Sequence, residues 1–372
     1  MHKITRILTL MIITAVFLLA CMSMGDDPSG DRLQRIVNST QYNSDEEQFQ
    51  NPNDTPLATG RPMTTILYDY FFNGEERISS SKLPEDPPKL SEFESKSENI
   101  RFVWFGHSTI LLEIDSIRIL IDPVFSNYAS PIPFMIKRFQ APVFNIDEIN
   151  DIDLILISHD HYDHLDYETI SKLKTRKLHY LVPLGVGAHL ESWGIDSSKI
   201  EELDWWETTI FQGLNFTCTP AQHFSGRGLF NGNSSLWASW SIQGQTQNVF
   251  FSGDSGYGEH YKKIGNRLGP FDLTFLENGA YSLDWKFVHQ LPEEGIQAHL
   301  DLKGKVMVPI HWGMFNLALH TWYEPIVRVS KEAKKQGVTL ITPKLGQLIS
   351  LKQNHVSQDW WSALVEGEGE GE

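Results

Sequence analysis

Three imidazoles and two carboxylates lie within the six residues His159-Asp160-His161-Tyr162-Asp163-His164. Imidazole and carboxylate groups bind Zn²⁺, and Fe and Mn sites use the same groups. One metal does not easily accept four ligands from so short a segment, whereas two neighbouring metals do. His159 and His161 can turn to one metal while Asp163 and His164 turn to the other. The segment therefore indicates a two-metal site that needs further ligands from elsewhere.

Candidates for the missing ligands occur at three later positions. His223 comes shortly after a strand-like run, Asp254 lies in a Ser-Gly-Asp-Ser-Gly segment, and His311 follows the run Val308-Pro309-Ile310. Each of these residues taken alone has a structural explanation, because a single His or a Gly-flanked Asp is ordinarily a packing or turn residue. Together with the six-residue cluster, they favour metal ligation.

The elements that must position these residues are short β-branched and aromatic runs separated by Gly, Pro, Asn and Asp, a pattern typical of strands. The apolar run 154–157 directly precedes the histidine cluster and indicates a strand covered on both faces. The runs between 101 and 121 predict an antiparallel meander. Strands with interspersed helices indicate an α/β layered sandwich with functional groups on loops. We expect strands at 101–105, 109–114, 117–121, 154–157, 178–182, 214–219, 236–242, 248–252, 273–276, 306–309 and 338–341, and helices near 167–174, 292–302 and 325–336.

Composition excludes several classes of protein. The 372 residues contain 31 Lys and Arg against 47 Asp and Glu, a net charge of −16. A polyphosphate partner needs a basic face, so this balance excludes nucleic acid. An apolar share of 41% supports a large core and excludes a disordered chain. Two cysteines are too few for a disulfide scaffold.

The first twenty residues read as an export signal. Lys3 and Arg6 precede an apolar run, 7–20, that is short for a membrane span but suits the core of a secretion signal. The run ends in Leu18-Leu19-Ala20-Cys21, which resembles a bacterial lipobox, in which the Cys is lipidated and the preceding segment is removed. A plain N-terminal anchor helix is the alternative. Both interpretations predict an exported protein tethered to a membrane.

An anchor at Cys21 has further consequences. The protein would be a bacterial lipoprotein facing the periplasm or the cell surface, and Met22 after the Cys favours the outer membrane. Cys218 would then be the only thiol, so no intramolecular disulfide is expected. The polar segment 21–48 is expected to be a flexible tether, 49–365 a single domain, and the Glu-Gly repeat at 366–372 a disordered acidic tail.

The pattern His-x-His-x-Asp-His after an apolar strand, with His223, Asp254 and His311, resembles the metal signature of the metallo-β-lactamase superfamily. One branch is closer still, the hydrolases similar to N-acyl phosphatidylethanolamine phospholipase D, with a resemblance that covers about 49–335. Its counterparts are Trp104-Phe105-Gly106-His107-Ser108-Thr109, Leu120-Ile121-Asp122-Pro123-Val124-Phe125-Ser126, Pro220-Ala221-Gln222-His223, Ser252-Gly253-Asp254-Ser255-Gly256-Tyr257 and Ile310-His311-Trp312-Gly313.

This resemblance implies a four-layer αββα sandwich with two divalent metals, first of all Zn²⁺, at one edge of the sheets. The implied ligands are His159, His161 and His223 for one metal, Asp163, His164 and His311 for the other, and Asp254 as a bridge. All seven positions are filled, which argues against a degenerate, non-catalytic descendant.

The resemblance also implies roles for neighbouring residues. Asp163 would orient the nucleophile as well as bind metal, and His107 and Asp122 would orient the ligands through hydrogen bonds. His289 matches a family position beside the substrate, where it would contact phosphate or protonate the leaving group; a purely structural histidine is the alternative. No motif supports a functional role for His179, His189, His260, His299, His320 or His355.

The implied activity is that of a zinc-dependent hydrolase with a metal-bridging hydroxide as nucleophile. The branch predicts a phosphodiesterase of phospholipase D type, acting on N-acyl phosphatidylethanolamine-like or related phospholipids or on a small phosphodiester. A lactonase or another ester or amide hydrolase is an alternative, because fold and metals do not fix the bond that is cleaved. A non-catalytic surface lipoprotein with structural metals is a second alternative.

One segment bears on the substrate. Residues 128–139 are apolar, broken by proline, and end in Lys137, Arg138 and Phe139. In the family this segment lies near the cavity mouth, where it would suit acyl chains and an anionic headgroup. A loop that packs on the core is the alternative.

Overall fold

Two seven-stranded sheets form the centre of the protein in the computed structural model, which describes residues 14, 19–53, 55–57, 60–74, 76–88, 95–132, 135–228, 231–353 and 359–369. The first sheet comes mainly from the N-terminal half. Its spatial order is β16 (Leu348–Ser350), β3 (Arg101–Trp104), β4 (Ile110–Ile114), β5 (Ile117–Ile121), β6 (Leu154–Leu156), β7 (His179–Pro183) and β8 (Ile200–Leu203).

The second sheet comes from the C-terminal half and has the same kind of plan. Its spatial order is β15 (Thr339–Leu340), β14 (Gly304–Ile310), β13 (Phe271–Glu277), β12 (Asn248–Phe251), β11 (Ser239–Gln243), β10 (Leu214–Thr219) and β9 (Thr208–Phe211). In each sheet one part is antiparallel and the other is parallel: β5 to β8 run parallel in the first sheet, and β12 to β15 in the second.

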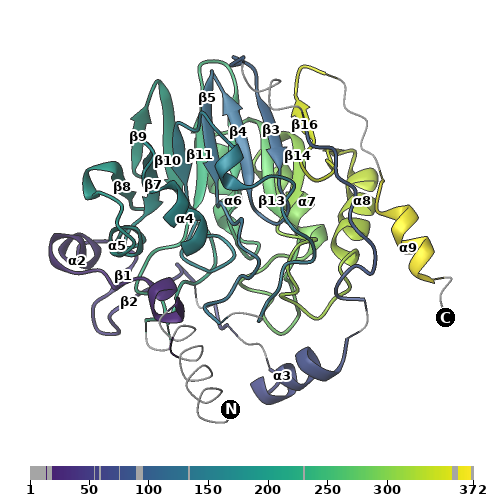
Figure 1. Ribbon diagram of the computed structural model, residues 1–372, viewed down its shortest axis with the longest axis horizontal. Helices are drawn as coiled ribbons and strands as arrows, with labels where there is room; N and C mark the ends of the chain where they lie inside the picture. The colour runs from purple at the N-terminus through teal and green to yellow at the C-terminus, as the bar shows by residue number, and fades with distance from the viewer. Residues whose placement is uncertain are drawn as a thin grey trace, which may run out of the picture.

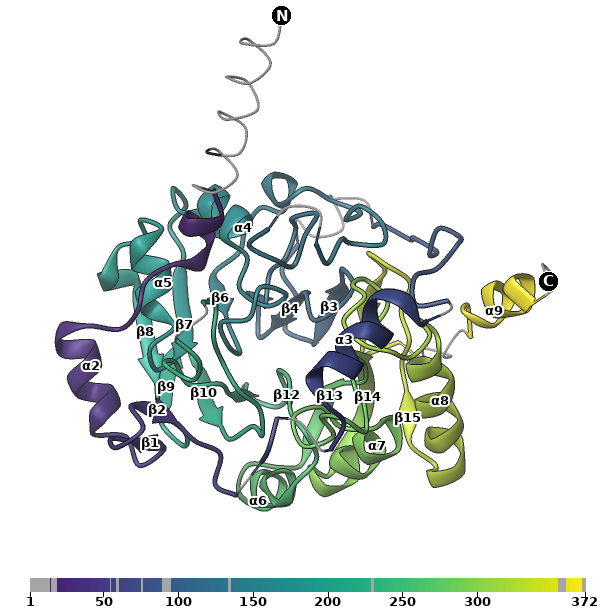
Figure 2. The same cartoon turned by 90° about the horizontal axis from the view of Figure 1, so that it is seen from below.

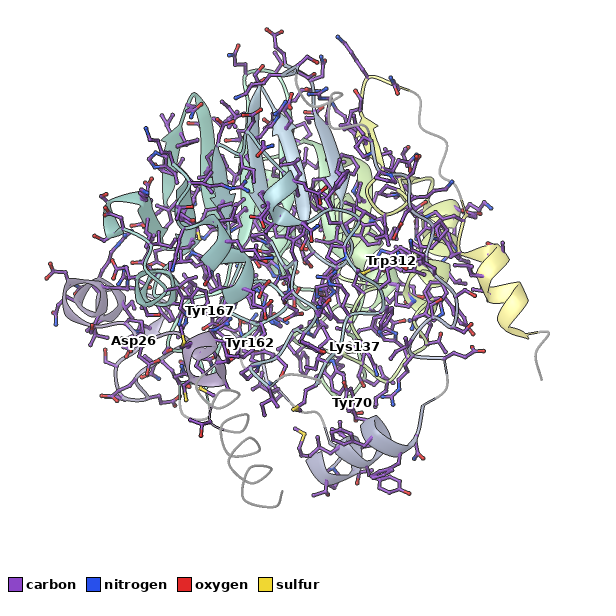
Figure 3. The ribbon with its side chains drawn as sticks, in the orientation of Figure 1. Asp26, Tyr70, Lys137, Tyr162, Tyr167 and Trp312 are labelled. Carbon is purple, nitrogen blue, oxygen red and sulfur yellow. The ribbon has the colours of Figure 1, made fainter. Side chains whose placement is uncertain are left out.

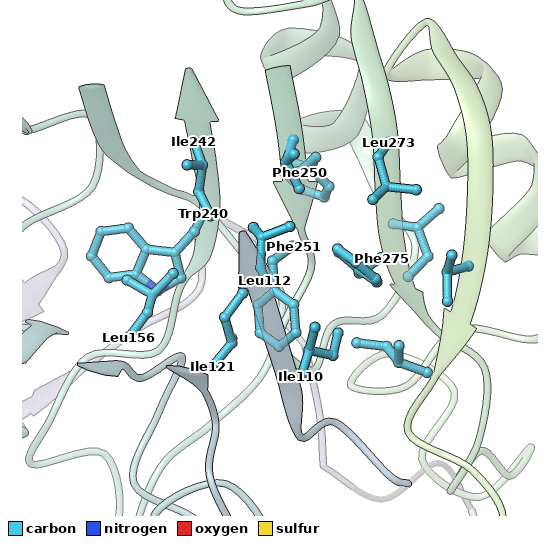
Figure 4. Packing of buried hydrophobic residues seen from close by; sticks show 14 of the residues in the cluster. Ile110, Leu112, Ile121, Leu156, Trp240, Ile242, Phe250, Phe251, Leu273 and Phe275 are labelled. Atoms are coloured by element: carbon cyan, nitrogen blue, oxygen red, sulfur yellow. The ribbon is translucent and has the colours of Figure 1, made fainter. Parts of the chain in front are cut away.

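Alternating side chains of the strands build two separate apolar clusters. On β4, Leu112 belongs to the cluster between the sheets, whereas the adjacent Leu111 belongs to a cluster that includes buried residues of the helices on the outer face. This alternation follows from the pleat, which points successive side chains to opposite faces. Figure 4 shows Leu112 and Leu156 opposite Trp240 and Phe275. Burying each large apolar side chain there stabilises the folded state by roughly 1.5–3 kcal/mol.

Helices connect the parallel strands and cover the outer faces of the sheets (Figures 1 and 2). On the first sheet these are α4 (Tyr167–Leu173) and α5 (Gly187–Ser192); on the second they are α6 (Glu259–Arg267), α7 (Pro292–Asp301) and α8 (Glu324–Gln336). Parallel neighbours need such crossovers because a tight turn cannot join them. The order helix, sheet, sheet, helix confirms the predicted αββα sandwich.

Most of the expected elements are present within one or two residues of their predicted ends, including the meander over 101–121. The sequence analysis missed the edge strands β8, β9 and β16, which are short and partly exposed. It also missed α5, α6, two short 3₁₀ helices at Ile146–Glu148 and Ser197–Lys199, and α3 (Met63–Phe72). Seven of the ten residues of α3 are aliphatic or aromatic, and they do not follow the helical periodicity that identifies an amphipathic helix.

The N-terminal segment differs from the flexible tether expected at 21–48. It contains α2 (Gly30–Val37) and a hairpin of β1 (Tyr42–Asn43) and β2 (Gln48–Phe49). Ile36 and Phe49 are fully buried, and the guanidinium of Arg32 donates to Glu191 and Glu202, both at 2.8 Å. Two apolar anchors and a paired cation thus order a segment whose average composition is polar.

The chain ends are only partly described. The export signal expected at 1–20 lies almost wholly outside the described residues. The tail expected at 366–372 overlaps α9 (Ser362–Gly369), and 370–372 lie outside the described part. In the ranges that the structure describes, no helix combines the length and the apolar character needed to cross a bilayer.

Candidate metal centre

The expected site residues follow strands that all point toward one edge of the sandwich. β3 and β5 run in the same direction because β4 reverses between them, and β10 and β12 do so because β11 reverses between them. The residues that follow these ends are His107 after β3, Asp122 after β5, residues 159–164 after β6, His223 after β10, Asp254 after β12, His289 after β13 and His311 after β14.

Three imidazoles converge in the first half of the site. His159, His161 and His223 each offer a ring nitrogen, and these atoms lie within 4.8 Å of one another. The Nδ1 atom of His161 lies 2.9 Å from Nε2 of His159 and 3.2 Å from Nε2 of His223. Burial lowers the pKa of all three rings from the usual 6.5, so each ring is neutral at pH 7.

These neutral rings direct nitrogen lone pairs into one space. Nδ1 of His223 lies 2.9 Å from the carbonyl oxygen of Val288 and donates its proton there, which leaves a lone pair on Nε2. If Nδ1 of His161 carries a proton, it donates to Nε2 of either His159 or His223, but not to both. The Nε2 atom that receives no proton keeps a free lone pair, and a divalent cation can bind to it.

The second half of the site contains Asp163, His164 and His311 together with His107, again with ligand atoms within 4.8 Å of one another. Nε2 of His107 donates to Oδ2 of Asp163 at 2.8 Å, and Nε2 of His164 lies 3.5 Å from the same oxygen. Burial lowers the pKa of His107 to about 3, so this ring is a neutral donor. His107 thus fixes the orientation of the Asp163 carboxylate.

Asp254 lies between the two halves. Its Oδ1 is 3.2 Å from Nε2 of His164 and 3.0 Å from Nδ1 of His311. Its Oδ2 is 3.9 Å from Nε2 of His159 and 3.8 Å from Nε2 of His223. One carboxylate oxygen therefore faces each half, which is the arrangement that a bridging ligand requires.

Two buried atoms at this junction, Oδ1 of Asp254 and Nε2 of His164, have no hydrogen-bond partner among the described residues. Although burial lowers the pKa of His164, the carboxylates of Asp254, Asp163 and Asp122 raise it well above 6.5. The position therefore attracts positive charge. Buried acceptors left unpaired are costly, and cations relieve that cost. The donor set accordingly fits divalent cations, with three nitrogen or oxygen donors on each side and Asp254 between them.

Hydrogen bonds fix one ring in each half. Oδ2 of Asp122 accepts from Nδ1 of His164 at 2.7 Å and from Oγ of Ser158 at 2.6 Å. Oγ of Ser158 also lies 2.9 Å from Nδ1 of His159. Such bonds orient imidazole ligands and select their tautomer. Asp122 thus holds the ring of His164, and Ser158 is a supporting residue that the sequence analysis missed.

The backbone is strained at three of these positions. His107, Asp122 and His311 adopt positive φ values of 52°, 40° and 63°. Non-glycine residues in this region cost roughly 1–3 kcal/mol each, and such strain gathers at functional sites. Gly253 has a φ of 56°, and a Cβ there would lie 2.8 Å from the carbonyl oxygen of Ala238. Only glycine therefore fits directly before Asp254.

Two further residues support the site and were not expected from the sequence. Glu277 is fully buried, and its carboxylate accepts from Nδ1 of His289 at 2.9 Å and from the backbone N–H of Gln290 at 2.7 Å. The side-chain amide of Asn51 pairs with the backbone of His223, donating to its carbonyl at 2.7 Å and accepting from its N–H at 3.2 Å. Glu277 ends a typical strand and Asn51 lies in a polar stretch, so neither carries a sequence signal.

A cavity of about 480 Å³ opens beside these residues. Its polar wall includes His161, Asp163, Asp254, His289 and His311. Its apolar lining consists of Leu57, Met63, Ala129, Ile136, Phe224, Ala280, Trp285, Val288 and Leu317, together with the ring of Tyr162. The arrangement places a cluster of metal-binding groups at the base of an apolar pocket.

The histidines without motif support have other neighbours. Nε2 of His189 lies 3.3 Å from Asp160, His260 bonds Ser255, and His299 bonds Thr274. His320 stacks on Tyr281, and His355 lies outside the described residues.

Comparison with known proteins identifies the family. Residues 117–312 match the model of the β-lactamase superfamily domain. The chain belongs to the metallo-β-lactamase superfamily. It is 41% identical over 290 residues to an uncharacterised protein of Mycobacterium tuberculosis, covering 76% of this chain and 78% of that one. It is 31% identical over 296 residues to the N-acyl-phosphatidylethanolamine-hydrolyzing phospholipase D 1 of Caenorhabditis elegans, covering 74% and 83%.

Two further matches concern the fold of this superfamily member and one part of its sequence. The solved metallo hydrolase of Ignicoccus hospitalis has the same fold, with a TM-score of 0.54, 18% identity, and coverage of 69% of this chain and all of that one. The outer membrane protein RomA of Klebsiella pneumoniae is 50% identical over 94 residues, which are 25% of this chain and 70% of that one. The protein is thus a metal-dependent hydrolase of the metallo-β-lactamase superfamily, with phospholipase D enzymes among its relatives.

Replacing Asp122 tests whether the hydrogen bonds behind the ligand rings support metal binding. Asp122→Ala is expected to lower metal affinity by about 10–100-fold, because His164 and Ser158 lose their shared acceptor. Titration against a competing chelator, with metal content measured by mass spectrometry, gives the affinity. Asp272→Ala is the matched control, since this carboxylate bonds Asn248 and Lys305 near the start of β13, at the opposite edge of the sheet. Equal affinities for the two variants would contradict the expectation.

Proposed function

We propose that the protein is a two-metal phosphodiesterase of phospholipase D type that acts on N-acyl phosphatidylethanolamine-like or related phospholipids. The observation that carries the proposal is the position of Asp254, whose two oxygens face two separate groups of ligand atoms at the base of an apolar cavity. The 31% identity with a phospholipase D over most of both chains supports the choice of phosphodiester as the bond cleaved.

The side chains divide the work between binding and proton transfer. Two divalent ions, Zn²⁺ in our proposal, would activate water and neutralise the charge of the phosphodiester. Asp163, oriented by His107, lines the cavity and would accept a hydrogen bond from the attacking water. The Nδ1 proton of His289 is held by Glu277, so its Nε2 is the atom left to contact phosphate or to pass a proton to the leaving alkoxide.

The apolar wall of the cavity suits acyl chains. Burying a methylene group contributes about 0.8 kcal/mol, so even a few methylenes give useful affinity. Ala129 and Ile136, from the segment expected at the cavity mouth, both line this wall. The expected cationic pair in that segment differs in the structure. Arg138 is buried and its guanidinium donates to the carbonyls of Ser126 and Val124, which leaves only Lys137 exposed for an anionic headgroup.

The alternatives have less support. A lactonase or another ester or amide hydrolase would use the same donors, but no relative described above carries such a name. A purely structural metal site is expected to be closed to solvent, whereas four of the seven proposed ligands line a cavity.

Metal removal and substrate comparison test the proposed activity. Chelation should abolish hydrolysis of N-acyl phosphatidylethanolamine, and added Zn²⁺ should restore it. Asp254→Ala should lower the metal content and abolish measurable hydrolysis, because each half of the site loses a facing carboxylate oxygen. The measurements are product release by mass spectrometry and metal content. Activity in metal-free protein, or turnover of acyl lactones without any phosphodiester turnover, would contradict the proposal.

Replacing His289 tests its role beside the metal ligands. His289→Gln should lower kcat/KM by about 10²–10⁴-fold with metal content unchanged. A fall in kcat alone indicates proton transfer to the leaving group, whereas a rise in KM indicates a phosphate contact. His299→Gln is the matched control, because this buried histidine bonds Thr274 and does not line the cavity. Full activity of His289→Gln would leave the residue with a structural role.

We also propose that the protein is an exported lipoprotein anchored through Cys21 in the outer membrane, facing the periplasm or the cell surface. The lipobox-like segment supports the anchor, and the relation to RomA, named as an outer membrane protein, supports the compartment. Palmitate labelling tests this point: wild-type protein should be labelled and sediment with membranes, and Cys21→Ala should lose the label. A labelled Cys21→Ala variant would contradict lipidation at Cys21.

A further inference from the structure

Helix α3 exposes an unusual amount of apolar surface. Its sequence, MTTILYDYFF, contains a single charged residue, and only Ile66 is buried. Five of its other large side chains are exposed, by 57% for Met63, 48% for Leu67, 57% for Tyr68, 61% for Phe71 and 74% for Phe72, and Tyr70 is half-buried. A large exposed apolar patch marks an interaction site.

The helix is held in place despite this exposure. The hydroxyl of Tyr70 donates to the carbonyl of Asn316 at 2.7 Å. Arg61, just before the helix, pairs with Asp69 at 2.6 Å and with Asp284 at 2.5 Å. These contacts fix α3 to the loops around the cavity, so its exposed apolar side chains form an ordered surface.

This surface borders the cavity. Leu57 and Met63, before and at the start of α3, line the cavity wall. Ile136 lines it from the 128–139 segment, whose neighbouring Ile132 and Met135 are 50% and 45% exposed. Exposed apolar side chains therefore lie on two segments that both border the cavity containing the metal-binding groups.

The turn that contains Cys21 adjoins the 128–139 segment. Cys21 and Met22 are exposed, and Ser23 shares a second, smaller pocket with Tyr128 and Pro131. Figure 1 shows this turn and α3 on the same lower side of the molecule, and Figure 2 shows them from below on either side of the loops between them.

The residues after Cys21 are fastened to the catalytic domain. The guanidinium of Arg227 donates to the carbonyl of Ser23 at 2.7 Å, and the indole of Trp193 donates to the carbonyl of Met22 at 2.8 Å. Arg227 also lies over the ring of Tyr162, 4.0 Å from its centroid. Tyr162, labelled in Figure 3, is the residue between His161 and Asp163 in the sequence, and it lines both pockets. The anchor position is therefore fixed beside the cavity.

We propose that α3, the exposed residues Ile132 and Met135 and the turn at Cys21 form one membrane-contact face, and that this face lies against the bilayer that holds the Cys21 lipid. The proposal rests on the lipid anchor of the proposed function. It commits to a lipid surface because the anchor is held at the rim of the same apolar face. Aromatic and aliphatic side chains with few charges are the groups that enter the interfacial layer of a bilayer. The cavity then opens directly onto that bilayer, and the enzyme acts on lipids of its own membrane.

A fluorescent label on α3 tests the contact without relying on hydrolysis. Phe72→Cys is labelled with an environment-sensitive dye in the full lipidated chain, where Cys218 is buried and Cys21 is lipidated. In vesicles of phosphatidylethanolamine and phosphatidylglycerol, the dye emission should shift to the blue and be quenched by brominated lipids. The control is Ile210→Cys on β9, 70% exposed and away from the face, where no quenching is expected. An unquenched dye at position 72 overturns the proposal. So does a shift that depends on protein concentration and not on lipid, since that indicates a second copy of the chain.

Removing the apolar surface tests its effect on turnover. The triple variant Leu67→Ser, Phe71→Ser, Phe72→Ser is expected to hydrolyse phospholipid in the vesicles that hold it at least 10-fold more slowly than wild-type protein. Its turnover of the water-soluble bis(4-nitrophenyl) phosphate should be unchanged. The matched control is Ile210→Ser with Val327→Ser. Unchanged turnover of vesicle lipid by the triple variant overturns the proposal. If wild-type protein cleaves neither substrate, the proposed function fails, and the dye measurement still decides the membrane contact.

Discussion

The carboxylate of Asp254 is the feature on which the site depends. It is buried, it follows the central strand β12, and its oxygens face ligand groups from both halves of the molecule. Burial raises the pKa of this group, but the neighbouring His164 and His311 outweigh burial and hold its pKa well below the usual value. A charge of this kind is stable in the interior only with positive partners around it. The alternating strand directions and the glycine at 253 place it there.

The sequence identifies most of the site because its chemistry is local. Five of the six residues 159–164 carry metal-binding groups, and an apolar strand precedes them. The positions of His223, Asp254 and His311 follow from the strand ends, once the family pattern is known. Strands β6 and β13 can be predicted from the sequence because both faces are buried and their residues are mostly apolar. Edge strands such as β9 are partly exposed and lack such an apolar run.

The missed residues act through contacts that no local pattern reveals. Glu277 ends an ordinary strand, yet its carboxylate holds His289. Asn51 lies in a polar stretch, yet its amide pairs with the backbone of His223. The segment near Arg32 is polar on average, and two buried apolar side chains with one ion-paired cation are sufficient to order it. Composition measures the mean of a segment, whereas a few contacts decide whether it packs.

The division of the ligands between the two sheets has a consequence for the order of folding. Residues 159–164 come from the first sheet, and His223, Asp254 and His311 come from the second. The folding chain therefore presents a complete donor set only after β14 has paired and the sheets have docked. Contacts that distant in sequence form late in folding because their loop-closure entropy is large. Metal capture would thus be among the last steps of maturation, and it would join the two halves as a cross-link does.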